Sequence, residues 1–532
     1  MFKYLIAIIV GAVSVAAYAP LEWWWLMPLC LAVLFQLMRN AKEWQASKLV
    51  FLFSLGQFGV GASWVYVSLQ TYGNMPVWMA SIAVFFFVVA YSLVIGFAGF
   101  LYSRFSEHHG QESVKNIVLF ASLWVLAEWS RSILFTGFPW LDVGYSQTTQ
   151  WLSGYAPLGS VYLVSFVTVL VSAMLSVFLR RLGVELSMRF LKTQSVSNVS
   201  MNNVVSKKLI IFYVGTIAVL VGSGAYLRTI HWSSATGQSF EAVIVQGNVS
   251  VDQKWLNDNQ SQIVSDYVDQ INQYSADLVI LPETALPVAL HQTDERLWNI
   301  LRGQNKALLS GVIERDLVSN KIYNSANLVC GSFSGASQST QGSFYQGQQI
   351  YRKQHLVPFG EYLPLRDLLG WLLNYLQIPM SDFSAGQAIQ SLSCEGLDIS
   401  LSICYEDAFA AEMRNAIVKN SQNGVLINIS EDAWFGDSLA PHQRVQMAQM
   451  RAIELARPML RSANSGPSTY IDFQGNVLAT TKQFQKDSMQ VSVMPRLGKT
   501  PFIHFGMWII YGCLMLVICF IVMPIVFAKK KV

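Results

Sequence analysis

The chain has 532 residues, of which 53% are hydrophobic and only 13% are charged. Soluble domains contain roughly 45–50% apolar and about 25% charged residues, so this composition excludes an ordinary water-soluble enzyme and favours a membrane protein with one soluble domain. The 36 basic and 32 acidic side chains nearly balance, which gives no electrostatic support for a nucleic-acid partner. The six cysteines include no C-x-x-C pair, so the sequence predicts neither a disulfide scaffold nor a zinc site.

The first 230 residues contain repeated apolar stretches, and a membrane-spanning helix needs about 20 such residues. We identify seven candidate spans there and an eighth near the end of the chain. They are approximately Leu5–Ala19, Trp24–Leu37, Leu49–Leu69, Val77–Tyr102, Ile117–Phe135, Leu158–Leu179, Leu209–Leu227 and Phe505–Phe527. A cleaved signal peptide at Met1–Ala19 is the less favoured alternative, because Pro20 and a second apolar stretch follow at once.

Positive charges predict the orientation of these spans, because Lys and Arg accumulate in cytoplasmic loops. Basic residues occupy alternate loops and the tail at 529–531, whereas the short loops at 71–76 and 138–155 contain none. We therefore predict a membrane bundle of seven helices at 1–230, an extracytoplasmic domain at 231–499, and a final span with a basic cytoplasmic tail at 500–532.

Two groups of charged residues occur at helical spacing. Glu128 and Arg131 lie three apart inside the fifth span, where charges are costly and such a pair usually neutralises itself. Contact with a lipid head group and snorkelling toward the interface are the alternatives. A second group is expected to form ion pairs on a solvated helix face: Arg451, Glu454, Arg457 and Arg461.

The segment after Phe240 has the pattern of an α/β layered domain, because short β-rich runs alternate with polar or helical stretches. The predicted strands are Ala242–Gln246, Leu278–Leu281, Ala307–Val312, Gln349–Arg352, Leu397–Ile403, Gly424–Ile429 and Thr469–Asp472. Helical periodicity covers Gln260–Tyr274 and Gln443–Glu454. About 270 residues are ample for one hydrophobic core.

Three polar residues stand at the ends of apolar runs, where strands deliver side chains to a site. They are Glu283, Lys353 and Cys404. A thiol near a carboxylate base and an ammonium makes a nucleophilic site, since the base takes the thiol proton and the cation stabilises an oxyanion. Each residue alone also has an ordinary structural explanation, because an isolated Cys is usually a small buried hydrophobe. Lys353 is expected to make Cys404 more acidic, and burial to oppose that shift.

The motifs around these residues resemble those of the nitrilase, or carbon–nitrogen hydrolase, superfamily. The three blocks are Leu281-Pro282-Glu283-Thr284-Ala285, Tyr351 to Glu361, and Ile403-Cys404-Tyr405-Glu406, in the family's order. With the apolar N-terminal half, the final span and the block 431–438, the whole chain is similar to the bacterial apolipoprotein N-acyltransferase family. Two departures are mild: Leu281 stands where many members have Trp, and Glu431 where Asn is common.

This resemblance implies an α-β-β-α sandwich on a bundle of about eight membrane helices, with the sandwich as the catalytic domain. It implies that Cys404 is the nucleophile, Glu283 the general base and then acid, and Lys353 the cation at the oxyanion. Glu361 corresponds to the family's second glutamate, which orients the lysine. Tyr405 and Glu406 flank the nucleophile in the pattern that members share.

The reaction implied is a ping-pong acyl transfer. Cys404 takes an acyl chain from a glycerophospholipid, leaving a lysophospholipid, and passes it to the α-amino group of a diacylglyceryl-cysteine at a lipoprotein N-terminus. No cofactor or metal is expected. The implied location is the bacterial inner membrane, among membrane lipids, with the catalytic domain in the periplasm. Trp255, Trp434 and the apolar run Leu368–Leu376 are candidates to hold the acyl chain.

Two other interpretations remain open at this stage. A membrane-anchored amidase or nitrilase would use the same residues and pass the acyl group to water. A transporter or lipid-binding protein would carry an inactive external domain, which the intact Glu283, Lys353 and Cys404 disfavour. Cys330 and Cys394 could form a disulfide outside the membrane, and their spacing does not decide whether they do.

Overall fold

The computed structural model describes residues 1–106, 113–192, 207–254, 256–286, 289–290, 293, 307–330, 348–362, 383–387, 391–394 and 396–529. The chain forms two compact units. The helical unit comprises Met1–Ser63, Ile82–Ile230 and Met507–Val532, and the sandwich unit comprises Trp64–Ser81 and His231–Gly506. Trp64–Ser81 lies among the predicted spans in the sequence, yet it belongs to the sandwich unit.

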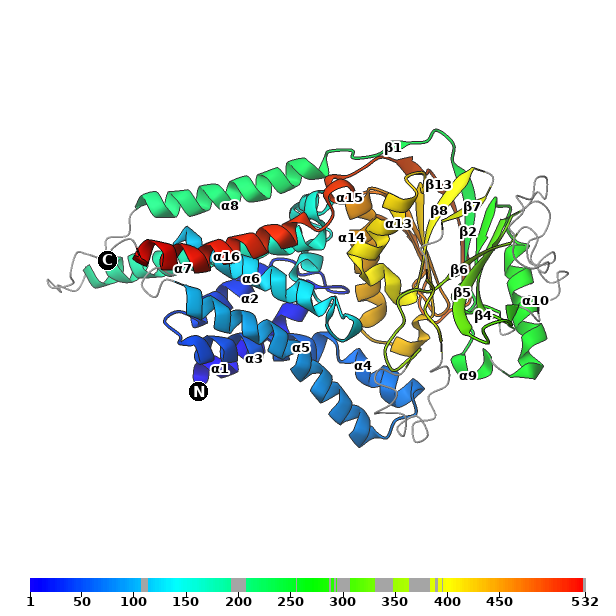
Figure 1. Ribbon diagram of the computed structural model, residues 1–532, viewed down its shortest axis with the longest axis horizontal. Helices are drawn as coiled ribbons and strands as arrows, with labels where there is room; N and C mark the ends of the chain where they lie inside the picture. The colour runs from blue at the N-terminus through cyan, green and yellow to red at the C-terminus, as the bar shows by residue number, and fades with distance from the viewer. Residues whose placement is uncertain are drawn as a thin grey trace. The chain divides into compact units, whose positions relative to one another are not determined.

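Every apolar stretch predicted as a span contains a helix. The helices are α1 (Phe2–Ser14), α2 (Leu26–Leu37), α3 (Glu43–Gly61), α5 (Val77–Phe105), α6 (Val114–Arg131), α7 (Ala156–Lys192), α8 (Lys207–Arg228) and α16 (Trp508–Lys529) (Figure 1). Glycines allow α1 and α3 to pack backbone to backbone, since a Cβ on Gly11 would meet the main chain of Phe53 and one on Gly56 that of Ile8. Small residues at such crossings are typical of helices that pack in membranes.

Among the described residues, three helices are long and apolar enough to cross a membrane: Val77–Phe105, Trp151–Gly183 and Ile210–Arg228. Glu43–Gly61 and Trp64–Tyr72, bent by 49°, make a fourth if they are taken as one span. Phe2–Ala17, Leu26–Leu37 and Trp508–Val522 are shorter apolar helices. The described residues therefore contain three or four candidate membrane spans, and the bundle of about eight spans stays a prediction.

Glu128 and Arg131 do not pair with each other as their main contact. Arg131 forms an ion pair of 2.5 Å with Asp142 and also donates to the Trp140 carbonyl at 2.8 Å. Glu128 accepts hydrogen bonds from the Trp124 indole and the Val143 backbone N–H. Both side chains are buried, so the snorkelling interpretation is wrong; the loop after α6 supplies the partners that helical spacing alone could not indicate.

Within the described residues, the sandwich unit contains two mixed six-stranded sheets. In the first, the strand order is β13 (Asp487–Val493), β2 (Phe240–Gln246), β3 (Leu278–Ile280), β4 (Ala307–Arg315), β5 (Ile322–Val329) and β6 (Gln348–Arg352). In the second, it is β12 (Val477–Thr480), β11 (Thr469–Ile471), β10 (Met459–Ala463), β9 (Val425–Ser430), β8 (Leu397–Ile403) and β7 (Leu392–Cys394). A separate ribbon pairs β1 (Ser234–Ala235) with β14 (Arg496–Leu497).

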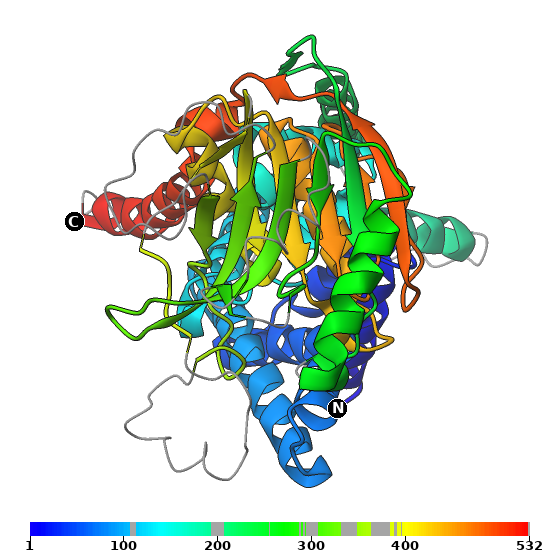
Figure 2. The same cartoon turned by 90° about the vertical axis from the view of Figure 1, so that its right-hand side faces the viewer.

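Each sheet has three parallel strands at its centre: β2, β3 and β4 in one, and β8, β9 and β10 in the other. Apolar side chains of both sheets, including Ile280, Leu309, Ile403 and Ile427, form the core between them. Helix α10 (Gln260–Ile271) covers the outer face of the first sheet, and α13 (Ala410–Lys419) and α14 (Ala440–Leu455) cover that of the second (Figures 1 and 2). The predicted α-β-β-α sandwich is confirmed.

The strands that sequence analysis missed include β5, β10 and β13. Two members of the charged group that was predicted to share one helix face therefore do not lie on that helix. Arg457 lies beyond the end of α14, and Arg461 lies in β10. All four charged residues of that group are buried, so the prediction of a solvated helix face is wrong. Arg451 and Glu454 do pair, at 2.9 Å, because i,i+3 spacing fixes the contact and says nothing about what covers it.

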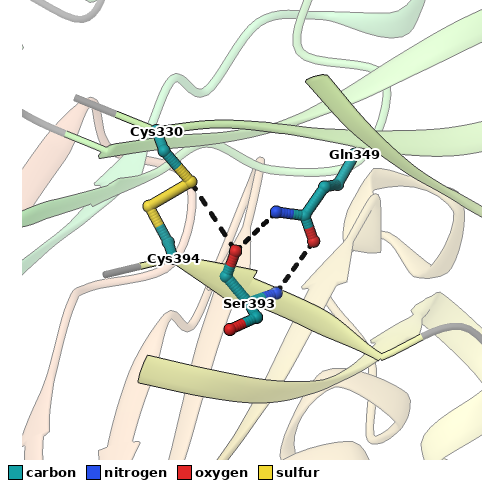
Figure 3. The surroundings of a disulfide bond; sticks show 4 residues. All are labelled: Cys330, Gln349, Ser393 and Cys394. Atoms are coloured by element: carbon teal, nitrogen blue, oxygen red, sulfur yellow. Dashed lines mark hydrogen bonds between the residues drawn. A yellow bond between two sulfur atoms is a disulfide. The ribbon is translucent and has the colours of Figure 1, made fainter. Parts of the chain in front are cut away.

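A disulfide joins the two sheets at one edge of the sandwich. Cys330 directly follows β5 and Cys394 ends β7, with their Cα atoms 5.7 Å apart. Beside it, the Gln349 amide donates to the Ser393 carbonyl at 2.5 Å and accepts from the Ser393 N–H at 2.9 Å (Figure 3). The 64-residue segment closed by this bond includes Lys353 and Glu361.

Replacing both cysteines, Cys330→Ser with Cys394→Ser, should lower the free energy of unfolding by about 2–4 kcal/mol, because a cross-link over a long segment restricts the unfolded chain. The measurement is the thermal-unfolding midpoint of the full chain in micelles, with and without reductant. Reductant should lower the midpoint of the wild type and of Cys519→Ser, but not that of the double variant. An equal response of all three proteins would contradict the prediction.

Candidate active site

Glu283 lies just beyond the carboxyl end of β3, on a short turn. Its carboxylate is held at both oxygens: the Asn324 amide donates to Oε1 at 2.7 Å, and the backbone N–H of Glu431 donates to Oε2 at 2.9 Å. The side chain is buried. One donor lies in a strand and the other directly after a different strand, so the orientation of the carboxylate is fixed by the protein and not by solvent.

Lys353 follows β6 and is almost fully buried, with 1% of its side chain exposed. Its Nζ lies 2.9 Å from Glu361 Oε1 and 3.5 Å from Glu283 Oε1. Burial lowers the pKa of Lys353, but the carboxylates of Glu361 and Glu283 outweigh burial and raise it above its ordinary value. Lys353 is therefore a permanent cation at the site.

Asn324 is a site residue that sequence analysis missed. It lies near the start of β5, and its single amide nitrogen donates at 2.7 Å to both Glu283 Oε1 and Glu361 Oε1. Its backbone carbonyl also accepts from the Lys353 N–H at 2.8 Å. The other oxygen of Glu361 accepts from the Val357 N–H. Asn324 thus links the two carboxylates that flank the Lys353 ammonium.

Cys404 begins a turn, Cys404–Ala408, directly after β8. Its φ of +51° places a non-glycine residue in the left-handed region, which costs of order 1–3 kcal/mol unless the surroundings hold it there. Two side chains do so through the Cys404 carbonyl: Arg444 Nη2 donates to it at 2.6 Å and Asn428 Nδ2 at 3.1 Å. The thiol thereby projects from a rigid, strained turn.

The pKa of the Cys404 thiol is raised to about 12, first by burial and then by the negative charge of Glu283. Arg444 and Lys353 act in the opposite direction and do not overcome these two effects. The expectation that Lys353 makes Cys404 more acidic than a free thiol is therefore wrong in its net sign. The reason is that burial disfavours the thiolate most, and the charge of Glu283 adds to that effect. The resting sulfur is a neutral thiol.

Glu406 organises the turn from inside the protein. Its carboxylate accepts from the backbone N–H groups of Ile403 and Gln354 and from the Tyr351 hydroxyl. Burial raises the pKa of Glu406 to about 7, although those backbone donors oppose the shift. Tyr405 is half-buried and packs edge-on against Phe409, with ring centroids 5.0 Å apart. Both residues directly follow Cys404 in this turn.

A second buried ion pair, between Lys254 and Glu431, adjoins Glu283. Lys254 Nζ contacts Glu431 at 2.5 Å and the Thr284 hydroxyl at 3.3 Å, and Asn464 donates to both carboxylate oxygens of Glu431. Burial raises the pKa of Glu431, and Lys254 opposes that shift. The Glu431 carboxylate is thus the counter-ion of Lys254, and the Glu431 backbone N–H holds the Glu283 carboxylate.

Trp434 is half-buried in the short turn that follows β9. Its ring meets that of Tyr72, with centroids 5.8 Å apart, and its carbonyl accepts from the Ser68 hydroxyl at 2.8 Å. Both partners belong to the Trp64–Ser81 segment of the sandwich unit. Trp255 and the run Leu368–Leu376 lie outside the described residues.

Comparison with known proteins identifies two matching family models. Residues 10–174 match the apolipoprotein N-acyltransferase N-terminal domain, and residues 242–501 match carbon-nitrogen hydrolase. Curated relatives named apolipoprotein N-acyltransferase include those of Methylococcus capsulatus, Nitrosomonas europaea and Haemophilus influenzae. They are 35%, 32% and 34% identical, over 100%, 96% and 96% of this chain and 97%, 95% and 92% of their own lengths.

Removing the Glu283 charge should make Cys404 more reactive toward an alkylating agent, because a neighbouring anion raises the pKa of a thiol and so lowers the thiolate fraction. In Glu283→Gln, the rate of Cys404 alkylation by iodoacetamide at pH 8.5 should rise about tenfold, the effect of about one pKa unit. The adduct is mapped by peptide mass spectrometry. The matched control is Glu412→Gln, whose carboxylate pairs with His355 and should leave the rate unchanged. A rate in Glu283→Gln at or below that of wild type would contradict the assignment.

Proposed function

This chain belongs to the apolipoprotein N-acyltransferase family, and from that premise we propose how its site transfers an acyl chain. The chain is an N-acyltransferase whose acceptor is a lipoprotein. We propose that the donor is a glycerophospholipid and that the chain passes through a thioester on Cys404. The observation that carries the proposal is the buried Glu283–Lys353–Glu361 network at strand ends around a thiol on a strained turn.

In the first half-reaction, Glu283 takes the proton of the Cys404 thiol while the sulfur attacks the ester carbonyl of the phospholipid. The Lys353 ammonium stabilises the oxyanion that develops there, a contribution that is large in a buried site. When the tetrahedral intermediate collapses, the C–O bond breaks and Glu283 gives its proton to the departing lysophospholipid oxygen. A concerted proton transfer is needed because the resting thiol has a pKa of about 12.

In the second half-reaction, the α-amino group of a diacylglyceryl-cysteine attacks the thioester. Glu283 takes a proton from the attacking nitrogen, the C–S bond breaks, and the sulfur recovers a proton from Glu283. No other energy source enters, because amines attack thioesters readily. The two half-reactions share one base and one nucleophile, so ping-pong kinetics follow.

Glu361 and Asn324 support Lys353 in this scheme and do not themselves react. Glu361 keeps the ammonium charged and fixed at 2.9 Å, and Asn324 prevents the two carboxylates from rotating away. Glu406 holds the backbone on both sides of the site, and Tyr405 is proposed to line the approach to the nucleophile. Trp434 and Trp255 are proposed to contact the acyl chain.

We further propose eight membrane spans, formed by the seven N-terminal helical stretches and α16, with domain limits at 1–230, 231–499 and 500–532. The proposed location is the inner membrane, with the catalytic domain in the periplasm. Basic residues in alternate loops support this orientation. The Cys330–Cys394 disulfide supports it as well, because disulfides persist in oxidising compartments. Donor and acceptor both carry acyl chains and stay in the bilayer.

The alternative of a membrane-anchored amidase is not favoured, because relatives over the whole chain are named N-acyltransferases. The two functions differ in the final acceptor. An amidase would discharge the acyl-enzyme to water and release free fatty acid. The proposed enzyme holds the thioester until an amine arrives.

Incubating the full-length protein with phospholipid micelles and no acceptor should add the mass of one acyl chain at Cys404. Intact-protein and peptide mass spectrometry measure the adduct, which should be absent in Cys404→Ala. A diacylglyceryl-cysteine peptide should discharge it and yield N-acylated peptide. Cys519→Ser is the matched control and should acylate as wild type does. Turnover to free fatty acid without N-acylated peptide would support the hydrolase instead, and an adduct on another residue would refute the role of Cys404.

A further inference from the structure

A second buried cation, Arg444, contacts the sulfur of Cys404, and the mechanism above does not use it. Its Nη1 lies 3.4 Å from Cys404 Sγ. We propose that Arg444 is a further catalytic residue, whose guanidinium stabilises the Cys404 thiolate as the sulfur attacks and again as it leaves, while Lys353 serves the substrate oxyanion. This inference rests on the proposed acyl transfer through Cys404.

The first argument is geometric. Arg444 lies in the first turns of α14, is 1% exposed, and reaches the turn that carries the nucleophile. One guanidinium nitrogen faces the sulfur while the other donates to the carbonyl of the same residue at 2.6 Å. Such a two-pronged contact uses the planar fork of arginine; a lysine would keep the charge beside the sulfur but not both hydrogen bonds. Arg444 therefore fixes both the strained backbone and the sulfur of Cys404.

The second argument is charge balance. Lys353 faces two carboxylates, Glu283 and Glu361, so its cluster carries a net negative charge until Glu283 takes up the thiol proton. Arg444 contacts Asp407 at 2.9 Å and Asp432 at 3.1 Å, but Asp432 also pairs with Arg461. The two arginines and two aspartates balance one another. Formation of a thiolate beside Arg444 thus adds an anion to a neutral cluster, whereas the Lys353 cluster is already negative.

The charged groups that act on the thiol come from several elements. Glu283 after β3 and Asp432 after β9 raise its pKa, whereas Arg444 on α14 and Lys353 after β6 lower it, with Arg444 the larger of the two. Arg444 keeps its own protons throughout, because its carboxylate partners raise its pKa above the ordinary value despite burial. The thiol proton goes to Glu283 and returns from it, so Arg444 contributes only charge and hydrogen bonds.

The test compares Arg444→Lys, Arg444→Met and the double variant Arg444→Met with Asp407→Asn. The double variant removes one charge of each sign, since a lone buried carboxylate could unfold the protein. We expect both Met variants to slow Cys404 alkylation by iodoacetamide at pH 8.5 about tenfold. We expect them to slow acyl-enzyme formation from phosphatidylethanolamine micelles about 100-fold. Arg444→Lys keeps the charge and should recover most of the alkylation rate.

Arg461→Lys and Asp407→Asn are the matched controls. Arg461 shares Asp432 but contacts the Pro467 carbonyl rather than Cys404, so Arg461→Lys should lower the thermal-unfolding midpoint without slowing alkylation. Asp407→Asn alone should not slow alkylation either. A folded double variant that alkylates and acylates at wild-type rates would overturn the proposal, as would an Arg444→Lys protein as impaired as Arg444→Met. If wild type forms no acyl-enzyme, the proposed function fails, and the alkylation rates still decide the role of Arg444.

Discussion

The burial of ionised groups around one sulfur atom is the constraint on which the active site depends. An ion taken out of water loses several kcal/mol of hydration, and only close, hydrogen-bonded partners offset that loss. Lys353 meets this requirement with Glu283 and Glu361, and Arg444 with Asp407 and Asp432. Asn324 and Asn428 supply neutral donors, to the Glu283 carboxylate and the Cys404 carbonyl respectively. A further cation at either place would change the net charge of the site. Each cation and its carboxylates therefore hold one another in place, because moving one of them would leave a buried charge without a partner.

The sandwich architecture brings these pairs together at one edge. The central strands run parallel within each sheet, so the residues that follow β8 and β9 lie at the same end of their sheet, and the residue that follows β3 lies at the corresponding strand end of the other. Because β5 and β6 are antiparallel, β5 begins beside the end of β6. Glu283 and Lys353 follow strands of the first sheet, whereas Cys404 follows a strand of the second sheet and Arg444 lies on a helix that covers it. The geometry of the site therefore requires the two packed sheets to keep a fixed position relative to each other. The Ser462 hydroxyl, which donates to the Val245 carbonyl across the core, and the Cys330–Cys394 bond both hold the sheets together.

The sequence predicts the groups that end apolar runs, because a buried central strand has a recognisable pattern and a polar residue at its end is conspicuous. Glu283, Lys353 and Cys404 are identified in this way, and the structure brings all three together. Asn324 is missed because β5 is buried on both faces, and a strand of that kind is recognised by a continuous apolar run. The Asn and Ser residues of β5 interrupt such a run, so the sequence predicts no strand there and gives Asn324 no place at a strand end. Arg444 is missed because its partners lie 37, 12 and 40 residues away along the chain, and helical spacing reveals only neighbours on the same helix. Arg461 is misassigned for the same reason, since periodicity continues past the end of α14 into β10.

In the proposed mechanism, two cations with separate tasks also explain how the site holds a nucleophile that is inert at rest. Thiolates, not thiols, undergo alkylation, oxidation and exchange with disulfides. Because burial and Glu283 raise the pKa of the Cys404 thiol, the sulfur is held in the less reactive thiol form between turnovers. A stronger net positive field would activate the sulfur continuously and remove this protection. In the proposed mechanism, activation is instead tied to the arrival of an acyl carbonyl. Glu283 then accepts the proton and loses the charge that raises the pKa of the thiol, while Arg444 and Lys353 keep theirs.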